Sequence, residues 1–284
     1  MKERNNIVGF FVLLIFFGLV LWFSLNSVTG ELRSRQNQYP EVHFFDVGQG
    51  DASLIELNSN VQMLIDGGPD KTILEHLGRE MPVDDYFIDY VILSHSHADH
   101  LNGLIYVAEK YDIGRVFMSE FVNKGSGIEY FLDLINERET TLSTVELGDF
   151  LNLSGAEIYF IWPERDRGKL KDLNDTSLVF TMTINNIDIF YTGDVSWGIL
   201  EANLDELGPV DILKVSHHGS KTGTSQKLIE VLKPTVSIIS VGKNRYGHPH
   251  REVLGMLYDT ILFRTDVDGN LSFLATSDGL KIKR

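Results

Sequence analysis

The chain from residue 40 onward alternates short apolar runs with clusters of Gly, Asn and Asp. Three of these runs, Val42–Phe45, Ala52–Leu57 and Val61–Ile65, predict strands joined by tight turns. Asn185-Asn186 separates two later runs and favours a two-residue hairpin turn. The remaining strands are expected at Tyr90–Leu93, Arg115–Met118, Phe150–Leu153, Glu157–Trp162, Leu178–Ile184, Ile187–Tyr191, Ile212–Val215, Val236–Ser240, Ile261–Phe263, Leu271–Leu274 and Leu280–Ile282.

Segments with helical spacing lie between these strands. Leu101–Lys110 is typical, because its apolar residues recur every three or four positions and fall on one helix face. Such alternation, with no internal repeat and no second break in composition, predicts one α/β domain over residues 41–284, with two sheets covered by helices. The other helices are expected at Thr72–Arg79, Ile128–Glu137, Trp197–Leu207, Gln226–Leu232 and Arg251–Tyr258, whereas Lys169–Asp175 is a polar loop.

The first 30 residues differ from this pattern, because they contain no charged residue after Arg4. The 19 residues Ile7–Leu25 are almost entirely apolar. At about 1.5 Å per residue they nearly match a hydrocarbon core of about 30 Å. Lys2 and Arg4 precede them, so the positive-inside rule places the N-terminus in the cytoplasm and the remainder outside. We therefore expect a membrane anchor at residues 1–30 and a polar linker at residues 31–40. A cleaved signal peptide, which would leave a secreted domain, is the alternative, although no A-x-A site follows the apolar run.

Composition restricts the chemistry. None of the 284 residues is cysteine, so disulfides and thiolate metal sites are excluded, and any metal must be bound by His, Asp or Glu. The formal net charge of −15 argues against a wide basic groove for nucleic acid, because phosphate binding normally relies on Lys and Arg. Otherwise an acidic surface indicates only good solubility.

Four metal-capable side chains lie within six residues of the stretch Ser94–His100 (SHSHADH), directly after a predicted buried strand. His95 and His97, two residues apart in an irregular loop, can aim both imidazoles at one point. Asp99 and His100 can turn to a second point nearby. Two divalent cations about 3.5–4 Å apart can activate a water and bind both oxygens of a displacement. A solvated loop with Asp99 as a helix cap is the alternative, but the density of ligands favours a metal site.

This H-x-H-x-D-H pattern resembles the metal-binding motif of the metallo-β-lactamase superfamily. Phe44–Ala52 (FFDVGQGDA), Lys214–Ser220 (KVSHHGS) and Tyr246–Pro249 (YGHP) further resemble the extracellular nuclease-like domain of the ComEC competence proteins. The resemblance covers roughly residues 42–281. It implies a four-layer αββα sandwich with a two-metal site at one edge between the sheets. It also implies a hydrolase domain on a single membrane tether, without the multi-spanning channel of ComEC.

The resemblance also assigns roles to single residues. Asp66, in the stretch DGG, corresponds to an aspartate that supports the metal loop by hydrogen bonds and does not bind metal. Asp194 corresponds to the carboxylate that bridges the two metals. His218, directly before Gly219, corresponds to the last metal ligand, with His217 as the alternative. His217 is then expected near the substrate, as a catalytic candidate, or beside the ligands. Because adjacent side chains in an extended stretch point oppositely, we do not expect both histidines to bind one ion.

The chain departs from the superfamily where a third-motif histidine is usual, because the matching stretch is Asn174–Ser177 (NDTS). Asp175 is a candidate ligand there, with a turn cap as the alternative, and Asn174 is expected to support the ligands. His248 is expected at the rim of the site, where it binds a phosphate oxygen or protonates the leaving group. A structural loop histidine is the alternative. Lys221 either contacts a substrate phosphate or is merely solvated.

Two histidines and two aspartates outside these motifs suggest no function in the sequence. His43 and His76 have no recognisable partners. Asp46 and Asp51 are expected to shape the turn around Gly48 and Gly50, with Asp51 able to face the site.

Ligands of His and carboxylate type suit two Zn²⁺ ions, with Mn²⁺ and Fe²⁺ as alternatives because no thiolate biases the choice. The expected mechanism is attack by a metal-bridged hydroxide, with Asp99, His217 and His248 as the catalytic candidates. The leading hypothesis is phosphodiester hydrolysis outside the cytoplasm, of DNA or a smaller diester, linked to DNA uptake. Ester, thioester or β-lactam hydrolysis on the same metals is one alternative. A non-catalytic accessory of a competence channel is the other, and no protein partner is deducible.

Overall fold

The first sheet of the domain, in this computed structural model, has eight strands in the order β15-β14-β1-β2-β3-β4-β5-β6. Neighbouring strands are parallel from β3 to β6 and antiparallel from β15 to β3. The strands are β1 (Glu41–Phe44), β2 (Ser53–Leu57), β3 (Val61–Ile65), β4 (Phe87–Leu93), β5 (Asp112–Met118), β6 (Thr141–Thr144), β14 (Leu271–Thr276) and β15 (Gly279–Lys283).

The second sheet has seven strands in the order β13-β12-β11-β10-β9-β8-β7. Here β10 to β13 are parallel and β7 to β10 antiparallel. The strands are β7 (Phe150–Leu153), β8 (Ala156–Trp162), β9 (Val179–Ile184), β10 (Ile187–Tyr191), β11 (Ile212–Lys214), β12 (Val236–Ile239) and β13 (Ile261–Arg264).

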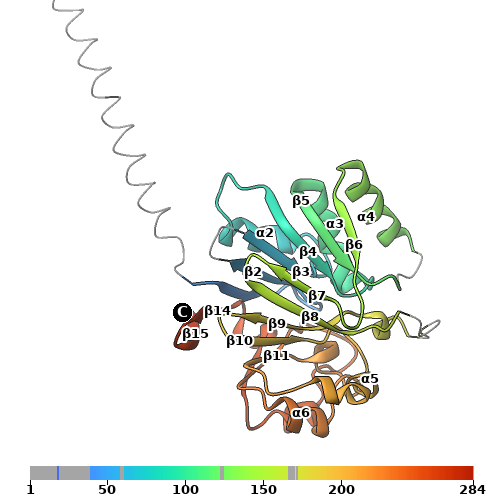
Figure 1. The fold of residues 1–284 in the computed structure, drawn as a ribbon, viewed down its shortest axis with the longest axis vertical. Helices are drawn as coiled ribbons and strands as arrows, with labels where there is room; N and C mark the ends of the chain where they lie inside the picture. The colour runs from blue at the N-terminus through green and yellow to red at the C-terminus, as the bar shows by residue number, and fades with distance from the viewer. Residues whose placement is uncertain are drawn as a thin grey trace, which may run out of the picture. The chain divides into compact units, whose positions relative to one another are not determined.

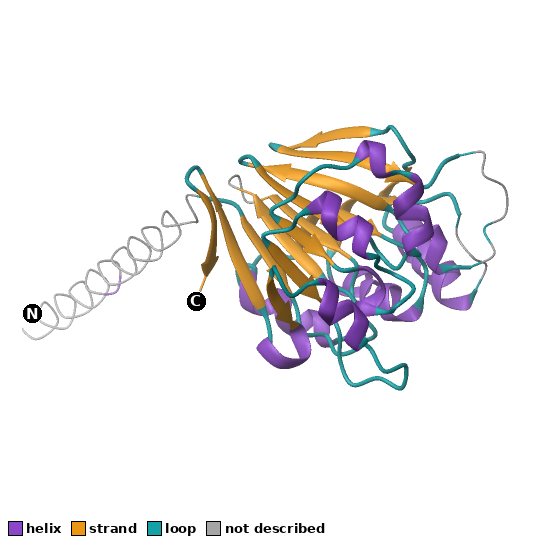
Figure 2. Ribbon diagram, turned by 90° about the horizontal axis from the view of Figure 1, so that it is seen from below, coloured by secondary structure: helices purple, strands orange, loops and turns teal. Residues whose placement is uncertain are grey.

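Helices connect the parallel strands, because a parallel pair needs a long crossover. The helices α2 (Thr72–Glu80), α3 (Ala98–Lys110) and α4 (Ser126–Glu137) follow β3, β4 and β5 and bury apolar faces on the first sheet. The second sheet is covered by α5 (Trp197–Ala202), α6 (Gln226–Leu232) and α7 (Arg251–Met256). The labelled helices of the two sets lie on opposite sides of the paired sheets in Figure 1. Figure 2 gives the view from below, with helices in purple beside the strands in orange. The short helices η1 (Asn174–Thr176), η2 (Leu204–Glu206), η3 (Ser216–Gly219) and α8 (Thr265–Asp268) complete the described elements.

A separate core fills the space between the sheets, because alternate strand residues face inward. Phe44 and Ile65 of the first sheet pack there with Phe180 and Tyr191 of the second, and all four are buried. Three apolar layers thus separate two sheets and two sets of helices, which confirms the expected αββα architecture of the domain.

Most predicted elements are present, and the differences have local causes. The hairpin turn at Asn185-Asn186 is confirmed, since both residues have positive φ angles of 51° and 61°. Helix α3 begins at Ala98 and not at Leu101, so part of the metal motif lies in its first turn. Helix α5 ends at Ala202, before a short η2 turn. Strand β6 was not predicted, because this largely exposed edge strand (TLST) lacks apolar alternation.

The structure describes residues 39–57, 61–121, 125–165, 170 and 172–283, with the isolated residue 18. The expected anchor at residues 1–30 and most of the linker at residues 31–40 lie outside this part of the chain. Among the described residues, no helix has the length and apolar character needed to cross a bilayer.

Candidate metal centre

The loop that leaves β4 and the first turn of α3 bring together the four metal-capable side chains of the sequence motif. His95 Nε2 lies 3.0 Å from His97 Nδ1, and the rings of His95 and His100 are 4.2 Å apart. His97 is the last residue before α3, while Asp99 and His100 lie within its first turn. A strand end and a helix start therefore fix this motif, and it is not the free loop that the sequence suggested.

Asp66 holds this motif from the end of β3. Its Oδ1 accepts the Ser94 amide at 2.8 Å, and its Oδ2 accepts the Ser94 hydroxyl at 2.7 Å and lies 2.8 Å from His100 Nδ1. A proton on His100 Nδ1 is therefore shared with Asp66, which leaves His100 Nε2 free to face the centre of the site. The next residue, Gly67, must be glycine, because a Cβ there would lie 2.4 Å from the backbone nitrogen of Leu104.

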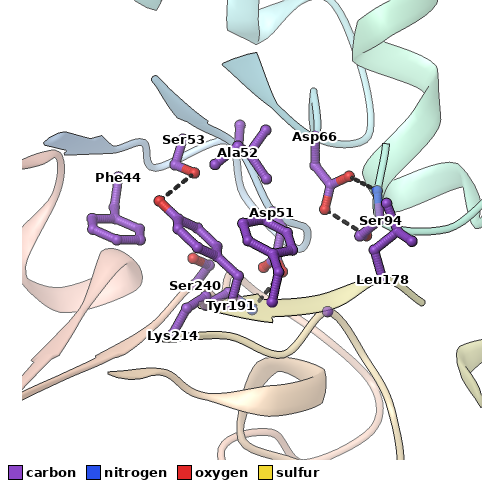
Figure 3. A pocket seen from close by; sticks show the side chains of 13 residues that line it. Phe44, Asp51, Ala52, Ser53, Asp66, Ser94, Leu178, Tyr191, Lys214 and Ser240 are labelled. Carbon is purple, nitrogen blue, oxygen red and sulfur yellow. Dashed lines mark hydrogen bonds and ion pairs between the residues drawn. The ribbon is translucent and has the colours of Figure 1, made fainter. Parts of the chain in front are cut away.

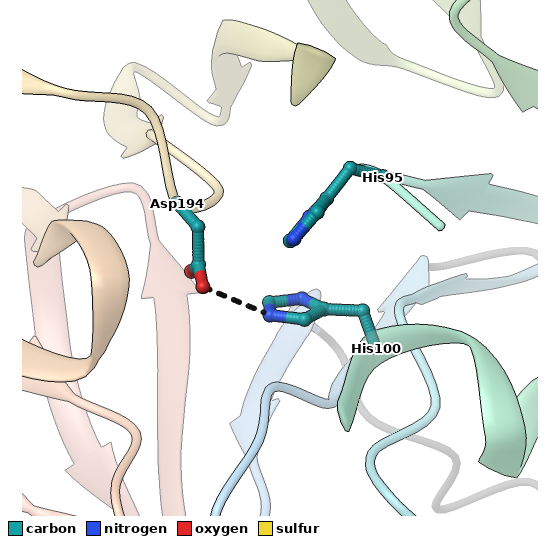
Figure 4. Close-up of side chains that lie close together, drawn as sticks. All are labelled: His95, His100 and Asp194. Atoms are coloured by element: carbon teal, nitrogen blue, oxygen red, sulfur yellow. Dashed lines mark ion pairs between the residues drawn. The ribbon is translucent and has the colours of Figure 1, made fainter. Parts of the chain in front are cut away.

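Asp194 meets the motif from the other sheet. It follows β10, is buried, and places Oδ2 3.4 Å from His100 Nε2 and 3.4 Å from His218 Nε2. Gly193 before it has φ of +49° and no room for a side chain, since a Cβ would lie 2.5 Å from Ser177 Cβ. Figure 4 shows His95 and His100 pointing toward the Asp194 carboxylate from the opposite sheet. One carboxylate thus lies between imidazoles that come from different layers of the fold.

His217 and His218 follow β11, but not in the extended conformation expected from the sequence. Their φ angles are 51° and 54°, so both have left-handed backbones and their side chains do not point oppositely. His218 is buried, donates from Nδ1 to the Ser240 carbonyl at 2.9 Å, and places Nε2 3.3 Å from Asp99 Oδ2. His217 is a quarter exposed, with Nε2 3.9 Å from Asp194 Oδ2. His218 therefore lies inside the cluster and His217 at its rim.

Unsatisfied atoms test whether these residues fit a metal. His100 Nε2, His218 Nε2 and Asp194 Oδ1 are all buried without a hydrogen-bond partner. Buried polar atoms are normally paired, so orphaned atoms that converge on one point indicate a missing ligand. Two groups of three ligand atoms, each group within 4.8 Å, are formed by His95, His100 and Asp194 and by Asp99, His100 and His218. Nitrogen and carboxylate donors of this kind suit zinc and similar divalent ions.

The electrostatics of the cluster favour cations. Burial holds the pKa of His95 well below its usual value, so this imidazole is neutral and able to bind metal. Burial alone would lower the pKa of His100 and His218, but the carboxylates around them, Asp194 above all, raise both pKa values well above the usual range. The burial of Asp194 is likewise outweighed by these imidazoles, which hold its pKa well below the ordinary value.

Asp51 and Lys214 form a buried ion pair beside the cluster that the sequence analysis missed. Lys214 Nζ contacts Asp51 Oδ2, and Asp51 Oδ1 lies 3.3 Å from His218 Nδ1. Figure 3 shows both residues in a narrow gap between the sheets, together with Asp66, Ser94 and other side chains. The one feature of the sequence that indicates this ion pair is a lysine within the apolar run of β11, because a buried lysine requires an acidic partner.

A cavity of about 480 Å³ opens in front of the cluster. His97, Asp99, Asp194 and both adjacent histidines of η3 line it. His248 also lines the cavity, and its ring lies 5.3 Å from that of His217. Burial and the neighbouring His217 lower the pKa of His248 to about 4, so His248 is neutral near pH 7.

The comparisons with known proteins agree with this geometry. The family model described as the metallo-beta-lactamase superfamily matches residues 45–243, which is more than half of the chain. The chain belongs to the metallo-β-lactamase superfamily. The matched region begins in the loop after β1 and ends after β12, so it includes every candidate ligand of the cluster.

Two relatives narrow this placement within the superfamily. The chain is 29% identical over 265 residues to ComE operon protein 3 of Bacillus subtilis, with 82% of this chain and 33% of the relative covered. It is 28% identical over 296 residues to Recombination protein 2 of Haemophilus influenzae, with 100% of this chain and 34% of that relative covered. The chain therefore spans about a third of the length of these relatives. They are ComEC-like competence proteins, so the resemblance seen in the sequence is confirmed.

A solved structure shows the same fold. The metallo-beta-lactamase fold protein YhfI of Bacillus subtilis superposes with a TM-score of 0.59 at 15% identity, covering 84% of this chain and 100% of that one. Metallo-β-lactamase folds bind divalent metals, often two, and this chain has the His and Asp clusters to do so.

The stretch that replaces the third-motif histidine lies in η1. Asp175 Oδ1 accepts the Ser196 amide at 3.0 Å just before α5, and Asp175 belongs to none of the metal-capable groups among the described residues. Asn174 lines the cavity, and its Oδ1 is buried without a hydrogen-bond partner. Lys221 is exposed and does not line the cavity. The structure therefore brings Asn174 to the site, whereas Asp175 has the contact of a turn cap.

Proposed function

We propose that this domain is a metal-dependent phosphodiesterase that acts outside the cytoplasm on DNA or a smaller diester. The observation that carries this proposal is the convergence of His95, His100 and His218 on Asp194. Asp194 and His218 also line an open cavity of about 480 Å³. A fold of the metallo-β-lactamase superfamily and competence-protein relatives support it.

Two divalent cations would be held by different parts of the cluster. Asp99, His100, Asp194 and His218 are the donors for one, and His95, His97 and Asp194 are the donors for the other. When bound, such cations supply Lewis-acid activation of water and of a phosphoryl oxygen. Zinc suits these donors, with manganese and iron as alternatives.

The remaining side chains orient these ligands and the substrate. Asp66 accepts a hydrogen bond from His100 Nδ1, and the Ser240 carbonyl accepts one from His218 Nδ1. The Nε2 atoms of both rings therefore face Asp194. His248 is neutral near pH 7, so it offers a hydrogen bond to a phosphate oxygen and not a permanent positive charge.

The charge of the cavity limits the substrate. Among the described residues that line it there is no Lys or Arg, and the chain carries a formal net charge of −15. Long duplex DNA requires many cationic contacts to its phosphates, so the metals themselves must supply most of the attraction. We therefore favour single strands, ends or small diesters as substrates.

The proposed location of the domain outside the cytoplasm rests on the N-terminal sequence. The apolar run at Ile7–Leu25, with Lys2 and Arg4 before it, supports a cytoplasmic N-terminus and an extracytoplasmic domain. A link to DNA uptake rests on the competence-protein relatives.

The test uses the full chain purified in detergent and loaded with Zn²⁺ or Mn²⁺. Bis-p-nitrophenyl phosphate and end-labelled single- and double-stranded DNA are assayed beside nitrocefin and a thioester. Metal-dependent cleavage of the diesters, lost in His100→Ala, supports the proposal. Cleavage of nitrocefin or thioester alone would replace it with the ester or lactam alternative. No turnover of any substrate by a chain with bound metal would favour a non-catalytic accessory.

A further inference from the structure

A second cluster of metal-capable side chains lies on β1 and β2, apart from the cavity. Glu41 and His43 are two residues apart on β1 and so share one face of the first sheet. Glu56 on β2 is paired directly opposite Glu41. None of the three lines the cavity described above. The sequence predicted His43 to be without partners, and the structure shows that this was wrong.

The three side chains converge closely. His43 Nε2 lies 3.3 Å from Glu41 Oε2 and 3.1 Å from Glu56 Oε1. Glu41 and His43 are fully buried, yet His43 Nε2 and Glu41 Oε1 have no hydrogen-bond partner. One buried imidazole nitrogen and one buried carboxylate oxygen thus lack a partner, and such atoms again indicate a missing ligand.

The other nitrogen of His43 is already occupied. His43 Nδ1 lies 2.8 Å from Ser272 Oγ on β14. Metal-binding histidines generally donate their second ring N–H to a neighbouring group, which fixes the tautomer. A hydrogen bond from Nδ1 to Ser272 leaves the lone pair of Nε2 directed at the two carboxylates.

The distances fit a coordination sphere. Zn–N and Zn–O bonds of about 2.0–2.1 Å at tetrahedral angles place neighbouring ligand atoms about 3.3 Å apart. The nitrogen–oxygen distances of 3.1 and 3.3 Å around His43 are close to this value.

The charges of the cluster also call for a cation. Glu41 and Glu56 face each other across the strand pair, and like charges in that position destabilise a sheet. Glu80 on α2 adds a third carboxylate, 4.0 Å from His43 Nδ1. Lys283 on β15 contacts Glu41 and supplies one positive charge. Three carboxylates and one ammonium leave two negative charges, which one divalent cation would neutralise.

We propose that Glu41, His43 and Glu56 bind a divalent cation, with zinc as the best match to a mixed nitrogen and carboxylate set. The ion joins β1 to β2 at the start of the domain and stabilises the fold without taking part in the reaction. Glu56 is partly exposed, so the site is open to solvent on that side.

Zinc content of the full chain tests the site, and it needs no enzymatic activity. The chain and its variants are equilibrated with Zn²⁺, desalted and analysed for zinc per mole of protein. His43→Gln and, separately, Glu56→Gln should each hold one equivalent less than the original chain. Glu75→Gln, which removes an exposed carboxylate from α2, is the matched control and should lose none. Zinc should also raise the Tm of His100→Ala, which retains this second site, more than that of His100→Ala/Glu56→Gln.

Circular dichroism identifies any variant that fails to fold, and Glu56→Gln is the milder change because its side chain is partly exposed. Equal zinc in folded Glu56→Gln and in the original chain would overturn the proposal, and the cluster would then be a network of polar contacts around His43 without a metal. Failure of the phosphodiesterase assays would leave this zinc measurement unaffected.

Discussion

Replacing Asp66 by asparagine separates the charge of this side chain from its shape. Asp66 accepts hydrogen bonds from the Ser94 amide and hydroxyl, and its Oδ2 lies 2.8 Å from His100 Nδ1. If the introduced side-chain amide keeps its oxygen toward the Ser94 N–H, its NH₂ group must face His100 Nδ1. Two donors cannot share that contact, so His100 must move its proton to Nε2, the atom that faces Asp194.

The expected loss of zinc affinity follows from this change of tautomer. A supporting partner of a metal-bound histidine is worth about 10- to 100-fold in metal affinity, and we expect Asp66→Asn to weaken zinc binding by that factor. The loss of a charge-assisted hydrogen bond costs about 1–3 kcal/mol of unfolding free energy, partly offset because a buried charge is removed. Ser94→Ala removes one hydroxyl but leaves the His100 contact, so its effect on zinc affinity should be smaller.

The assay is competition for zinc against a chromogenic chelator, with the His100 tautomer read by ¹⁵N–¹H correlation of the imidazole nitrogens. In the metal-free protein, the original chain should show a proton on His100 Nδ1, and Asp66→Asn should show none there. Zinc affinity within twofold of the original chain, with the proton still on Nδ1, would refute the positioning role of Asp66.

Three further changes test separate parts of the account. Because His248 is neutral above its pKa of about 4, His248→Gln should lower kcat/KM for the diester about 10-fold or more without changing the pH profile between pH 5.5 and 8. Hydrogen bonds from the Thr72 hydroxyl and from the Thr72 amide lower the pKa of Asp70. The contribution of Asp70 to stability is therefore present above the ordinary pKa and is lost as pH falls through the lowered one. Asp70→Asn should remove that part of the acid dependence of Tm. Gly103→Ala would place a Cβ 1.7 Å from the Gly67 carbonyl oxygen, so it should separate α3 from the Asp66 turn and reduce both Tm and zinc content.

Each of these predictions has a contradicting result. A changed profile for His248→Gln between pH 5.5 and 8 would mean that His248 titrates there. If Tm falls with pH in the same way in Asp70→Asn and in the original chain, Asp70 does not contribute to the acid dependence of stability. Gly78→Ala is the control for Gly103→Ala, because its Cβ meets nothing within 4 Å on α2 and should stabilise by about 0.5–1 kcal/mol. Equal Tm values for both glycine variants would show that the fold does not require the close approach of Gly103 to Gly67.

Sequence reasoning found those features of the site that depend on local order. Ser94–His100 concentrates its ligands in seven residues after a buried strand, so the motif was visible before any contact was known. The apolar runs likewise identified both sheets, since strand periodicity is a local property. Asp194 was recognised only by family resemblance, because a single Asp after a strand is common.

Features that depend on tertiary contacts were not predictable. The left-handed backbones of His217 and His218 are stabilised by the surrounding fold, and nothing in the HHG stretch requires them. Asp51 and Lys214 are far apart in sequence, and only the packing of the sheets joins them. His43 lacked partners in the sequence for the same reason, since Glu56 and Ser272 reach it across neighbouring strands.

The most direct test of the central claim is anomalous diffraction at the zinc edge from crystals of the zinc-saturated full chain. The account predicts two peaks about 2.0–2.2 Å from carboxylate oxygens of Asp194, one beside His100 and His218 and the other beside His95 and His97. Saturated crystals with no anomalous peak beside Asp194 would contradict it.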